Sequence, residues 1–214
     1  MADVSTRTPR HWRLWVDPAA WAAVLRVRTD LLDEPYCAQW ADCGWPLVAT
    51  SIPSHAPATL IPVGLALPPA VGKKRLSFIL PRAAIKRTEP PLRLAAASRS
   101  APASWTSCIN ALIDMAPDTA VFGSLAWQHS TGLPYVGPAS DLDLLFVHHE
   151  REKSEALLRG IALIAATAAL RLDGELVRED GSAAQWRELH CGAPQVLVKS
   201  LTGVALVRRE EFLA

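Results

Sequence analysis

The sequence predicts an α+β protein in which a C-terminal mixed β-sheet with flanking helices follows a smaller, mixed N-terminal domain. Apolar residues make up 50% of the 214 residues, which is enough for a substantial core. Helical and strand-like apolar patterns alternate in the second half, whereas the first half is richer in proline and shows shorter β-like pieces. This order of elements is typical of helices packed on a sheet.

Residues 1–100 are predicted to form the smaller domain, which would bind the substrate or a carrier protein. The stretch "PAAWAAVLRVR" predicts a helix with Asp17 as N-cap and Pro18 at its first position. A proline-rich segment follows, with β-like pieces such as "TLIPVGL", and "KRLSFIL" predicts a strand. The small-residue stretch "RLAAASRSAPAS" is predicted to be a linker, with the domain boundary near Ala101.

Residues 101–214 are predicted to form the catalytic domain. Its first helix is "SWTSCINALIDM", with Ser104 as a plausible N-cap. The short strand "TAVFG" ends at Gly123, and "SLAWQHS" follows as a helical turn or short helix. The remaining elements are a strand "DLDLLFVHH", a long helix "EREKSEALLRGIALIAATAALRL", and strands "LDGELVRE", "VLVKS" and "VALVRR".

The overall charge and the cysteines limit the possible classes of protein. The formal net charge of +1 gives no reason to expect a nucleic-acid partner. The four cysteines lack CxxC spacing, so neither a zinc site nor a disulfide scaffold is expected. The first residues lack the apolar core of a signal peptide, and the longest apolar run, "IALIAATAAL", is too short to span a bilayer. We therefore expect a cytoplasmic protein without a membrane partner.

Two aspartates, Asp141 and Asp143, lie one residue apart on a predicted strand. Residues at i and i+2 of a strand point the same way, so both carboxylates would project from one face while Leu142 and Leu144 point to the core. Neighbouring carboxylates repel each other unless a proton or cation lies between them. Mg²⁺ held by a few carboxylates and substrate phosphates is the usual solution, so Asp141 and Asp143 are the predicted metal ligands.

A Gly-Ser pair upstream fits the same chemistry. Gly123 would let the backbone approach a ligand closely, and Ser124 would start a helix. The N–H groups at that helix start and the serine hydroxyl would then face a phosphate. Gly123 and Ser124 are therefore predicted phosphate-binding residues.

A third carboxylate is expected on a neighbouring strand, where it would act as a base on the attacking hydroxyl. "RLDGELVRE" offers Asp173 and Glu175 on one strand face, and Asp173 is favoured because Glu175 lies one pleat further on. The alternative is a strand with a solvated acidic face, which an isolated Asp-x-Asp equally suits. The ordered set of Gly-Ser, Asp-x-Asp and a later carboxylate argues against that alternative.

Basic residues offer further contacts with phosphate. Lys199, at the end of "VLVK", is predicted to reach a phosphate, although an ordinary strand-end lysine fits the pattern too. A basic cluster lies between Lys73 and Arg99. It would steer an anionic donor or an acidic carrier protein to the site, or form a solvated face with compensating acids.

The set Gly123-Ser124, Asp141-x-Asp143 and a later carboxylate resembles the nucleotidyltransferase superfamily signature. The segment "FGSLAWQHSTGLPYVGPASDLDLL", whose gap between serine and aspartate is long, resembles that of the phosphoribosyl-dephospho-CoA transferases. These are the holo-acyl-carrier-protein synthases of malonate decarboxylase. The resemblance continues through "LDGELV", "QWREL" and "VLVKSLTGVAL", and more loosely through "GWPLV" and "VGLALPP". Ala49 and Thr50 stand where family members often carry two arginines.

The resemblance implies a nucleotidyltransferase-like catalytic domain and a reaction. The donor is 2'-(5''-triphosphoribosyl)-3'-dephospho-CoA, the acceptor is a serine of the apo acyl-carrier protein of malonate decarboxylase, and pyrophosphate is released. Mg²⁺ is the implied cofactor. Two alternatives remain at this point: another nucleotidyltransferase that adds AMP to a small molecule or protein, and a non-catalytic carrier-binding module.

Overall fold

The structure, a computed structural model, describes residues 8–31, 33–51, 57–201 and 203–214. The chain forms two compact units, which are described separately below. The first consists of residues 1–91 with 130–134, and the second of residues 92–129 with 135–214. The mixed α+β fold in two parts that the sequence predicts is confirmed.

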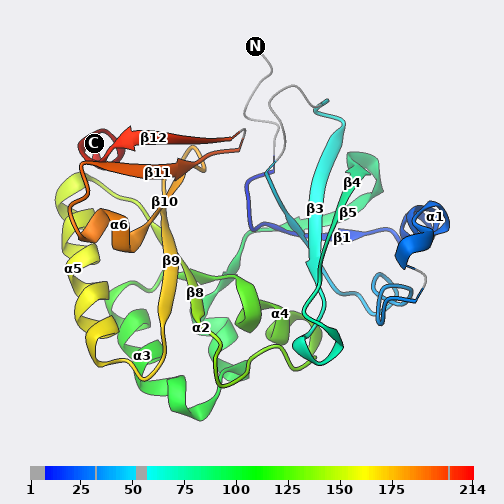
Figure 1. Ribbon diagram of the computed structural model, residues 1–214, viewed down its shortest axis with the longest axis horizontal. Helices are drawn as coiled ribbons and strands as arrows, with labels where there is room; N and C mark the ends of the chain where they lie inside the picture. Colours follow the sequence, from blue (N-terminus) through cyan, green and yellow to red (C-terminus); the bar gives the residue numbers. More distant parts are fainter. Residues whose placement is uncertain (1–7, 32, 52–56, 202) are drawn as a thin grey trace. The chain divides into compact units, whose positions relative to one another are not determined.

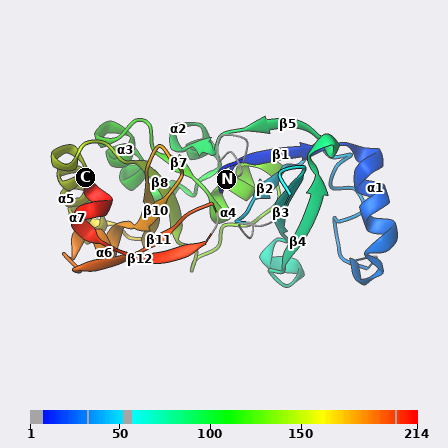
Figure 2. The same ribbon diagram turned by 90° about the horizontal axis from the view of Figure 1, so that it is seen from above.

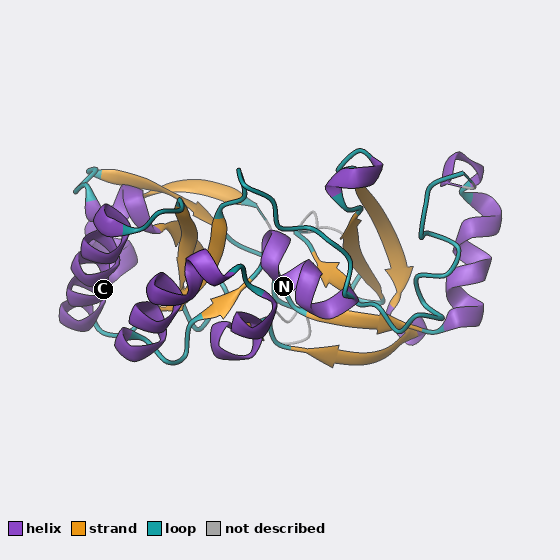
Figure 3. Ribbon diagram, turned by 90° about the horizontal axis from the view of Figure 1, so that it is seen from below, coloured by secondary structure: helices purple, strands orange, loops and turns teal. Residues whose placement is uncertain are grey.

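The N-terminal unit is built on an antiparallel sheet with the strand order β4-β3-β2-β1-β5. Its strands are β1 (Arg13–Val16), β2 (Leu47–Ala49), β3 (Leu60–Ala66), β4 (Arg75–Pro81) and β5 (Ile85–Glu89). Figure 3 shows that strands and loops make up most of this unit. Among the described residues of 8–91, the single α-helix is α1 (Pro18–Val27). At its start, Asp17 Oδ1 accepts hydrogen bonds from the amides of Ala19 and Ala20. The predicted N-cap is thereby confirmed.

The second unit contains a mixed sheet with the strand order β12-β11-β10-β9-β8-β7-β6. Its strands are β6 (Leu92–Arg93), β7 (Ala120–Val121), β8 (Leu142–Val147), β9 (Leu172–Val177), β10 (Ala183–Gln185), β11 (Gln195–Lys199) and β12 (Val204–Arg208). The pair β8–β9 is parallel and the other described pairs are antiparallel. Figure 2 shows the β11–β12 hairpin, whose second strand leads directly into the C-terminal helix.

Helices of the second unit bury one face of this sheet (Figure 1). They are α2 (Leu94–Ala97), α3 (Thr106–Met115), α4 (Gly123–Thr131), α5 (Arg151–Thr167), α6 (Trp186–His190) and α7 (Arg209–Leu213). The core joins alternate strand residues such as Leu144 and Leu176 to Leu112 of α3 and Ile161 of α5. This alternation leaves the intervening strand positions on the opposite face, which we call the polar face.

The boundary between the two units lies earlier in the sequence than the linker pattern predicted. The sequence placed the boundary near Ala101, whereas the structure divides the chain between Pro91 and Leu92. The supposed linker is ordered because Leu92 pairs with Val121 in the sheet, and Leu94 and Ala97 are buried in the core. The Ser104 cap is also wrong: a 3₁₀ turn, Ala103–Trp105, precedes α3, and no side chain caps that helix.

None of the helices in the described part of the chain is long and apolar enough to cross a membrane. Residues 1–7, on which the expectation about a signal peptide partly rests, lie outside the described residues.

Candidate active site

Asp143 and Asp173 are direct neighbours on the two parallel strands of the second sheet. In the β8–β9 ladder Asp143 pairs with Asp173, and the leucines before them, Leu142 and Leu172, pair with each other. The leucines are fully buried in the core, whereas both aspartates are half-buried. Paired residues of a ladder project from the same face, so the two carboxylates share the polar face. Glu175 pairs with Leu145, one pleat further along the same ladder.

The Gly-Ser turn lies against Asp143. Gly123 begins α4 directly after β7, and its φ of +64° is one that residues with a Cβ rarely adopt. A Cβ placed on Gly123 would lie 1.8 Å from Oδ2 of Asp143. The residue before Gly123 is also held next to this strand, since Phe122 N donates to the Asp143 carbonyl at 3.1 Å. The structure therefore places Gly123 against the Asp143 carboxylate, and Ser124 follows it in the first turn of α4.

The carboxylate of Asp173 is held by two donors on one oxygen. Gly174 N and Gln185 Nε2 each donate to Asp173 Oδ1 at 2.9 Å. Gln185, the last residue of β10, was not predicted from the sequence. A single glutamine between a short strand and a short helix carries no signal by type or spacing.

Asp141 lies just before β8 and has a different neighbour. Arg171, which precedes β9, brings its Nε to 3.8 Å from Asp141 Oδ2. Both side chains are partly exposed, so this ion pair contributes little to stability. Arg171 is therefore a weakly held partner of Asp141.

Lys199 lies on the polar face but reaches Glu175. Its Nζ is 2.7 Å from Glu175 Oε1, and Glu175 is only 5% exposed. Lys199 extends from β11 across β10, where its ladder partner is the small Ala183. The cation that the sequence assigned to phosphate thus compensates a buried carboxylate one pleat from Asp173.

The comparisons with known proteins cover nearly the whole chain. Residues 9–91 match the profile of the phosphoribosyl-dephospho-CoA transferase MdcG N-terminal domain, and residues 92–210 match that of the MdcG C-terminal domain. The chain belongs to the phosphoribosyl-dephospho-CoA transferase family.

Curated members of the transferase family are similar over almost their full length. A phosphoribosyl-dephospho-CoA transferase of Bradyrhizobium diazoefficiens is 38% identical over 96% of this chain and 92% of its own. One of Xanthomonas axonopodis pv. citri is 39% identical over 94% of each chain, and one of Xanthomonas campestris pv. campestris is 36% identical over 82% and 84%. No solved structure matches. The division between the two family profiles coincides with the boundary between the two units.

The long insertion between Ser124 and Asp141, part of the resemblance to the transferase family, is ordered around Gln128. The Oε1 of Gln128 accepts hydrogen bonds from the amides of Tyr135 at 3.1 Å and Val136 at 2.9 Å. Its Nε2 donates to the Ser100 carbonyl. Trp127 stacks on Tyr135, which is buried. The helix that carries the Gly-Ser turn therefore also anchors the segment leading to Asp141.

Half of the basic cluster between Lys73 and Arg99 is compensated by acids. Lys74 pairs with Glu34, Lys86 with Asp17, Arg87 with Glu89, and Arg93 with Asp118. Arg87 also lies 3.6 Å from the ring centroid of Trp15. For these four residues the structure favours a solvated face over a patch that steers a substrate.

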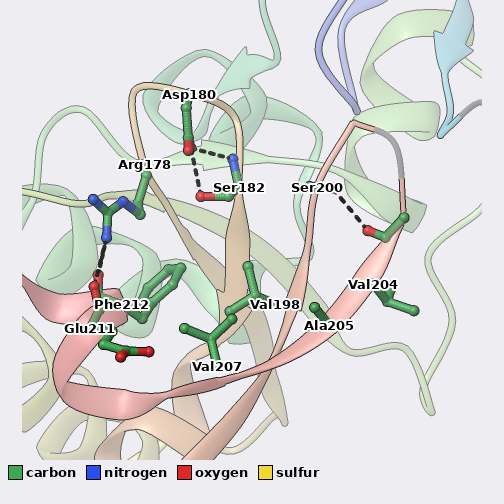
Figure 4. A pocket seen from close by; sticks show the side chains of 11 residues that line it. Arg178, Asp180, Ser182, Val198, Ser200, Val204, Ala205, Val207, Glu211 and Phe212 are labelled. Atoms are coloured by element: carbon green, nitrogen blue, oxygen red, sulfur yellow. Dashed lines mark hydrogen bonds between the residues drawn. The ribbon is translucent and has the colours of Figure 1, made fainter. Parts of the chain in front are cut away.

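A cavity of about 450 Å³ lies elsewhere in the second unit (Figure 4). Its lining includes Arg178, Val198, Val207 and Phe212. Val198 directly precedes Lys199 on β11, so its side chain points to the face opposite the carboxylates. None of the predicted site residues lines this cavity.

The carboxylates fit a hard divalent cation by their chemistry. Asp143 and Asp173 present oxygen donors side by side, and the absence of a Cβ on Gly123 lets the turn lie directly against the Asp143 carboxylate. Within the described residues no group of three or more His, Cys, Asp or Glu side chains is placed to hold a metal ion by itself. This donor set suits Mg²⁺, which typically takes one or two carboxylates and completes its shell with water and substrate phosphates.

Proposed function

We propose that this chain transfers the phosphoribosyl-dephospho-CoA group from 2'-(5''-triphosphoribosyl)-3'-dephospho-CoA to a serine of the apo acyl-carrier protein of malonate decarboxylase. The observation that carries the proposal is the packing of the Gly123 turn against Asp143, with Asp173 at the adjacent ladder position, in a chain of this family. A phosphate-binding turn beside paired carboxylates suits attack on a phosphate with a polyphosphate leaving group.

The residues of the turn would bind the triphosphate. The amide groups at the start of α4 and the hydroxyl of Ser124 donate hydrogen bonds to phosphate oxygens, and the helix dipole favours the negative charge. Asp141 and Asp143 would hold Mg²⁺, with Arg171 released from Asp141. When bound, the ion neutralises charge on the phosphate oxygens.

Asp173 would act on the acceptor. The serine oxygen of the carrier forms a bond to the α-phosphorus, and its proton passes to Asp173 Oδ2. The bond between the α-phosphorus and its bridging oxygen to the β-phosphate breaks, and pyrophosphate leaves with that oxygen. Positioning and charge neutralisation supply most of the rate, since no covalent intermediate with the protein is needed.

The test is incubation of the protein with the donor, Mg²⁺ and the apo carrier protein, followed by mass spectrometry of the carrier. The expected product is a carrier heavier by one phosphoribosyl-dephospho-CoA group, with stoichiometric pyrophosphate. A parallel reaction with ATP in place of the donor distinguishes transfer of AMP. A carrier of unchanged mass with the donor would refute the proposal.

Asp143→Asn should abolish transfer while the fold remains. The amide keeps the size of the side chain but removes the negative charge next to the Gly123 turn. The side chain then no longer attracts the Mg²⁺ ion that accompanies the triphosphate. Mass spectrometry measures the loss, and circular dichroism checks the fold. Transfer by the variant at the wild-type rate would remove Asp143 from the metal site.

A further inference from the structure

Gln185 stands at the junction of β10 and α6 and forms hydrogen bonds in two directions. Its Oε1 accepts from the amides of Arg187 at 2.5 Å and Glu188 at 3.3 Å, which makes it the N-cap of α6. Its Nε2 donates to Asp173 Oδ1 at 2.9 Å. We propose that Gln185 is a positioning residue that orients the Asp173 carboxylate for transfer, an inference that rests on the proposed function.

The orientation of the Gln185 amide is determined by its partners. The two amide groups of α6 can only donate, so the carbonyl oxygen of the side chain must face them. The NH₂ group is thereby turned toward Asp173, whose Oδ1 accepts the hydrogen bond. Reversing the amide would break all three hydrogen bonds at once.

The backbone of Gln185 is equally fixed. β10 lies between β9 and β11, and Gln185 pairs with Glu175 in the β9–β10 ladder. Its side chain leans along the polar face by one pleat to reach Asp173. A donor on a strand with neighbours on both sides holds its acceptor more rigidly than a donor on a loop.

Both donors to Asp173 act on the same oxygen. Gly174 N and Gln185 Nε2 occupy Oδ1, so Oδ2 is the oxygen left for an acceptor hydroxyl or a cation. With the Gln185 donor removed, the carboxylate can rotate about its Cβ–Cγ bond, and Oδ2 is no longer held in a single orientation. The rate of transfer then falls, while binding of the donor substrate changes little.

Two variants separate this role from the capping of α6. Gln185→Thr keeps a short capping hydroxyl but cannot reach Asp173. Gln185→Glu keeps an acceptor for the cap but places a second negative charge beside Asp173. Gln195→Thr, at an exposed position of β11, is the matched control.

The steady-state assay measures kcat and KM for the donor substrate. We expect kcat to fall about 10- to 100-fold in Gln185→Thr and further in Gln185→Glu, with KM changed less than about twofold, as for groups that hold a ligand in place. The Gln195→Thr variant should match the wild type. Wild-type kcat in Gln185→Thr, or a loss confined to KM, would overturn the inference.

A second measurement does not depend on activity. The side-chain amide resonances of Gln185, identified by their absence from the Gln185→Thr spectrum, should shift in Asp173→Ala because their acceptor is gone. Unchanged resonances would overturn the inference whatever the enzyme does. If the wild type transfers nothing but these resonances shift, the proposed function fails and the positioning of Asp173 by Gln185 stands.

Discussion

At the scale of single residues, Gly123 is a position where both the backbone conformation and the contact with Asp143 depend on the absence of a side chain. A side chain there is disfavoured twice, by the left-handed φ of +64° and by the Asp143 carboxylate that occupies the space of a Cβ. The first effect is a property of the turn, whereas the second acts directly on a proposed metal ligand. A substitution can separate them.

Gly123→Ala should destabilise the protein and abolish transfer. Gly192→Ala is the matched control, because Gly192 has a φ of +75° but a Cβ added there would meet no atom within 4 Å. Both variants should lose about 1–2 kcal/mol from the left-handed conformation, and Gly123→Ala a further 1–3 kcal/mol from the clash. Urea unfolding and the transfer assay measure the two effects. Equal stability of the two variants would contradict the contact with Asp143.

Lys199→Met should lower the free energy of unfolding by about 1–3 kcal/mol, because Glu175 is left nearly buried without its cation. The double variant Lys199→Met with Glu175→Gln should regain part of this loss, since the remaining side chain is neutral. Chemical denaturation gives both values. A double variant no more stable than Lys199→Met alone would show that the ion pair is not the cause.

Some of these residues carry a signal in the sequence and others do not. Asp143 was predicted because alternation along β8 places its side chain on the face opposite to the buried leucines of that strand. The same alternation along β9 applies to Asp173. The pairing of Asp143 with Asp173 depends on the register of two strands far apart in sequence, which local patterns do not contain. Gln185 was missed because its role arises from three partners on two other elements.

At the scale of elements, the long and periodic segments were predicted and most of the short ones were not. The strands β8 and β9 and the helices α1, α3 and α5 have clear apolar periods. The strands β6, β7 and β10 have two or three residues each. Of these, only β7 was expected, because "TAVFG" is apolar, whereas the "AAQ" of β10 becomes a strand only through its neighbours on both sides.

The residue directly after β8, His148, contacts α7. The ring of His148 packs edge-on against Phe212 at 5.9 Å, and its Nε2 is buried. Burial, and then the charge of Arg178, lower the pKa of His148 below its ordinary value of 6.5. The unfolded chain therefore takes up a proton at a higher pH than the folded protein, so stability should fall as the pH drops below about 6.5.

His148→Gln should flatten the pH dependence of stability on the acid side of that value, since the titrating group is gone. Thermal unfolding at a series of pH values from neutral downward measures the slope. Gln195→Thr, at an exposed position without a titrating side chain, is the control and should keep the wild-type slope. The same slope in His148→Gln and the wild type would assign the effect to other groups.

At the scale of the whole molecule, the second unit has a hydrophobic core of its own. The buried cluster runs from Leu92 to Leu213 and includes Trp105 and Trp186. Every residue of this cluster lies in the second unit. The unit thus meets the requirement for a domain that folds independently.

We expect a fragment of residues 92–214 to fold cooperatively in isolation. Dispersed amide resonances and a single unfolding transition in urea would support this, with the full-length chain as reference. Because residues 130–134 belong to the first unit, the fragment should be somewhat less stable than the same region in the full chain. A fragment without cooperative unfolding would show that the second core depends on the first unit.

The parallel pairing of β8 and β9 has a consequence for how the protein is made. Adjacent parallel strands need a connection that returns to the starting edge, and α5 supplies it here. On the ribosome, Asp143 emerges well before Asp173, and the two cannot meet until the whole intervening helix has been synthesised and has docked. A chain truncated before residue 173 therefore lacks the second carboxylate altogether, so the pair of the proposed site forms only late in biosynthesis.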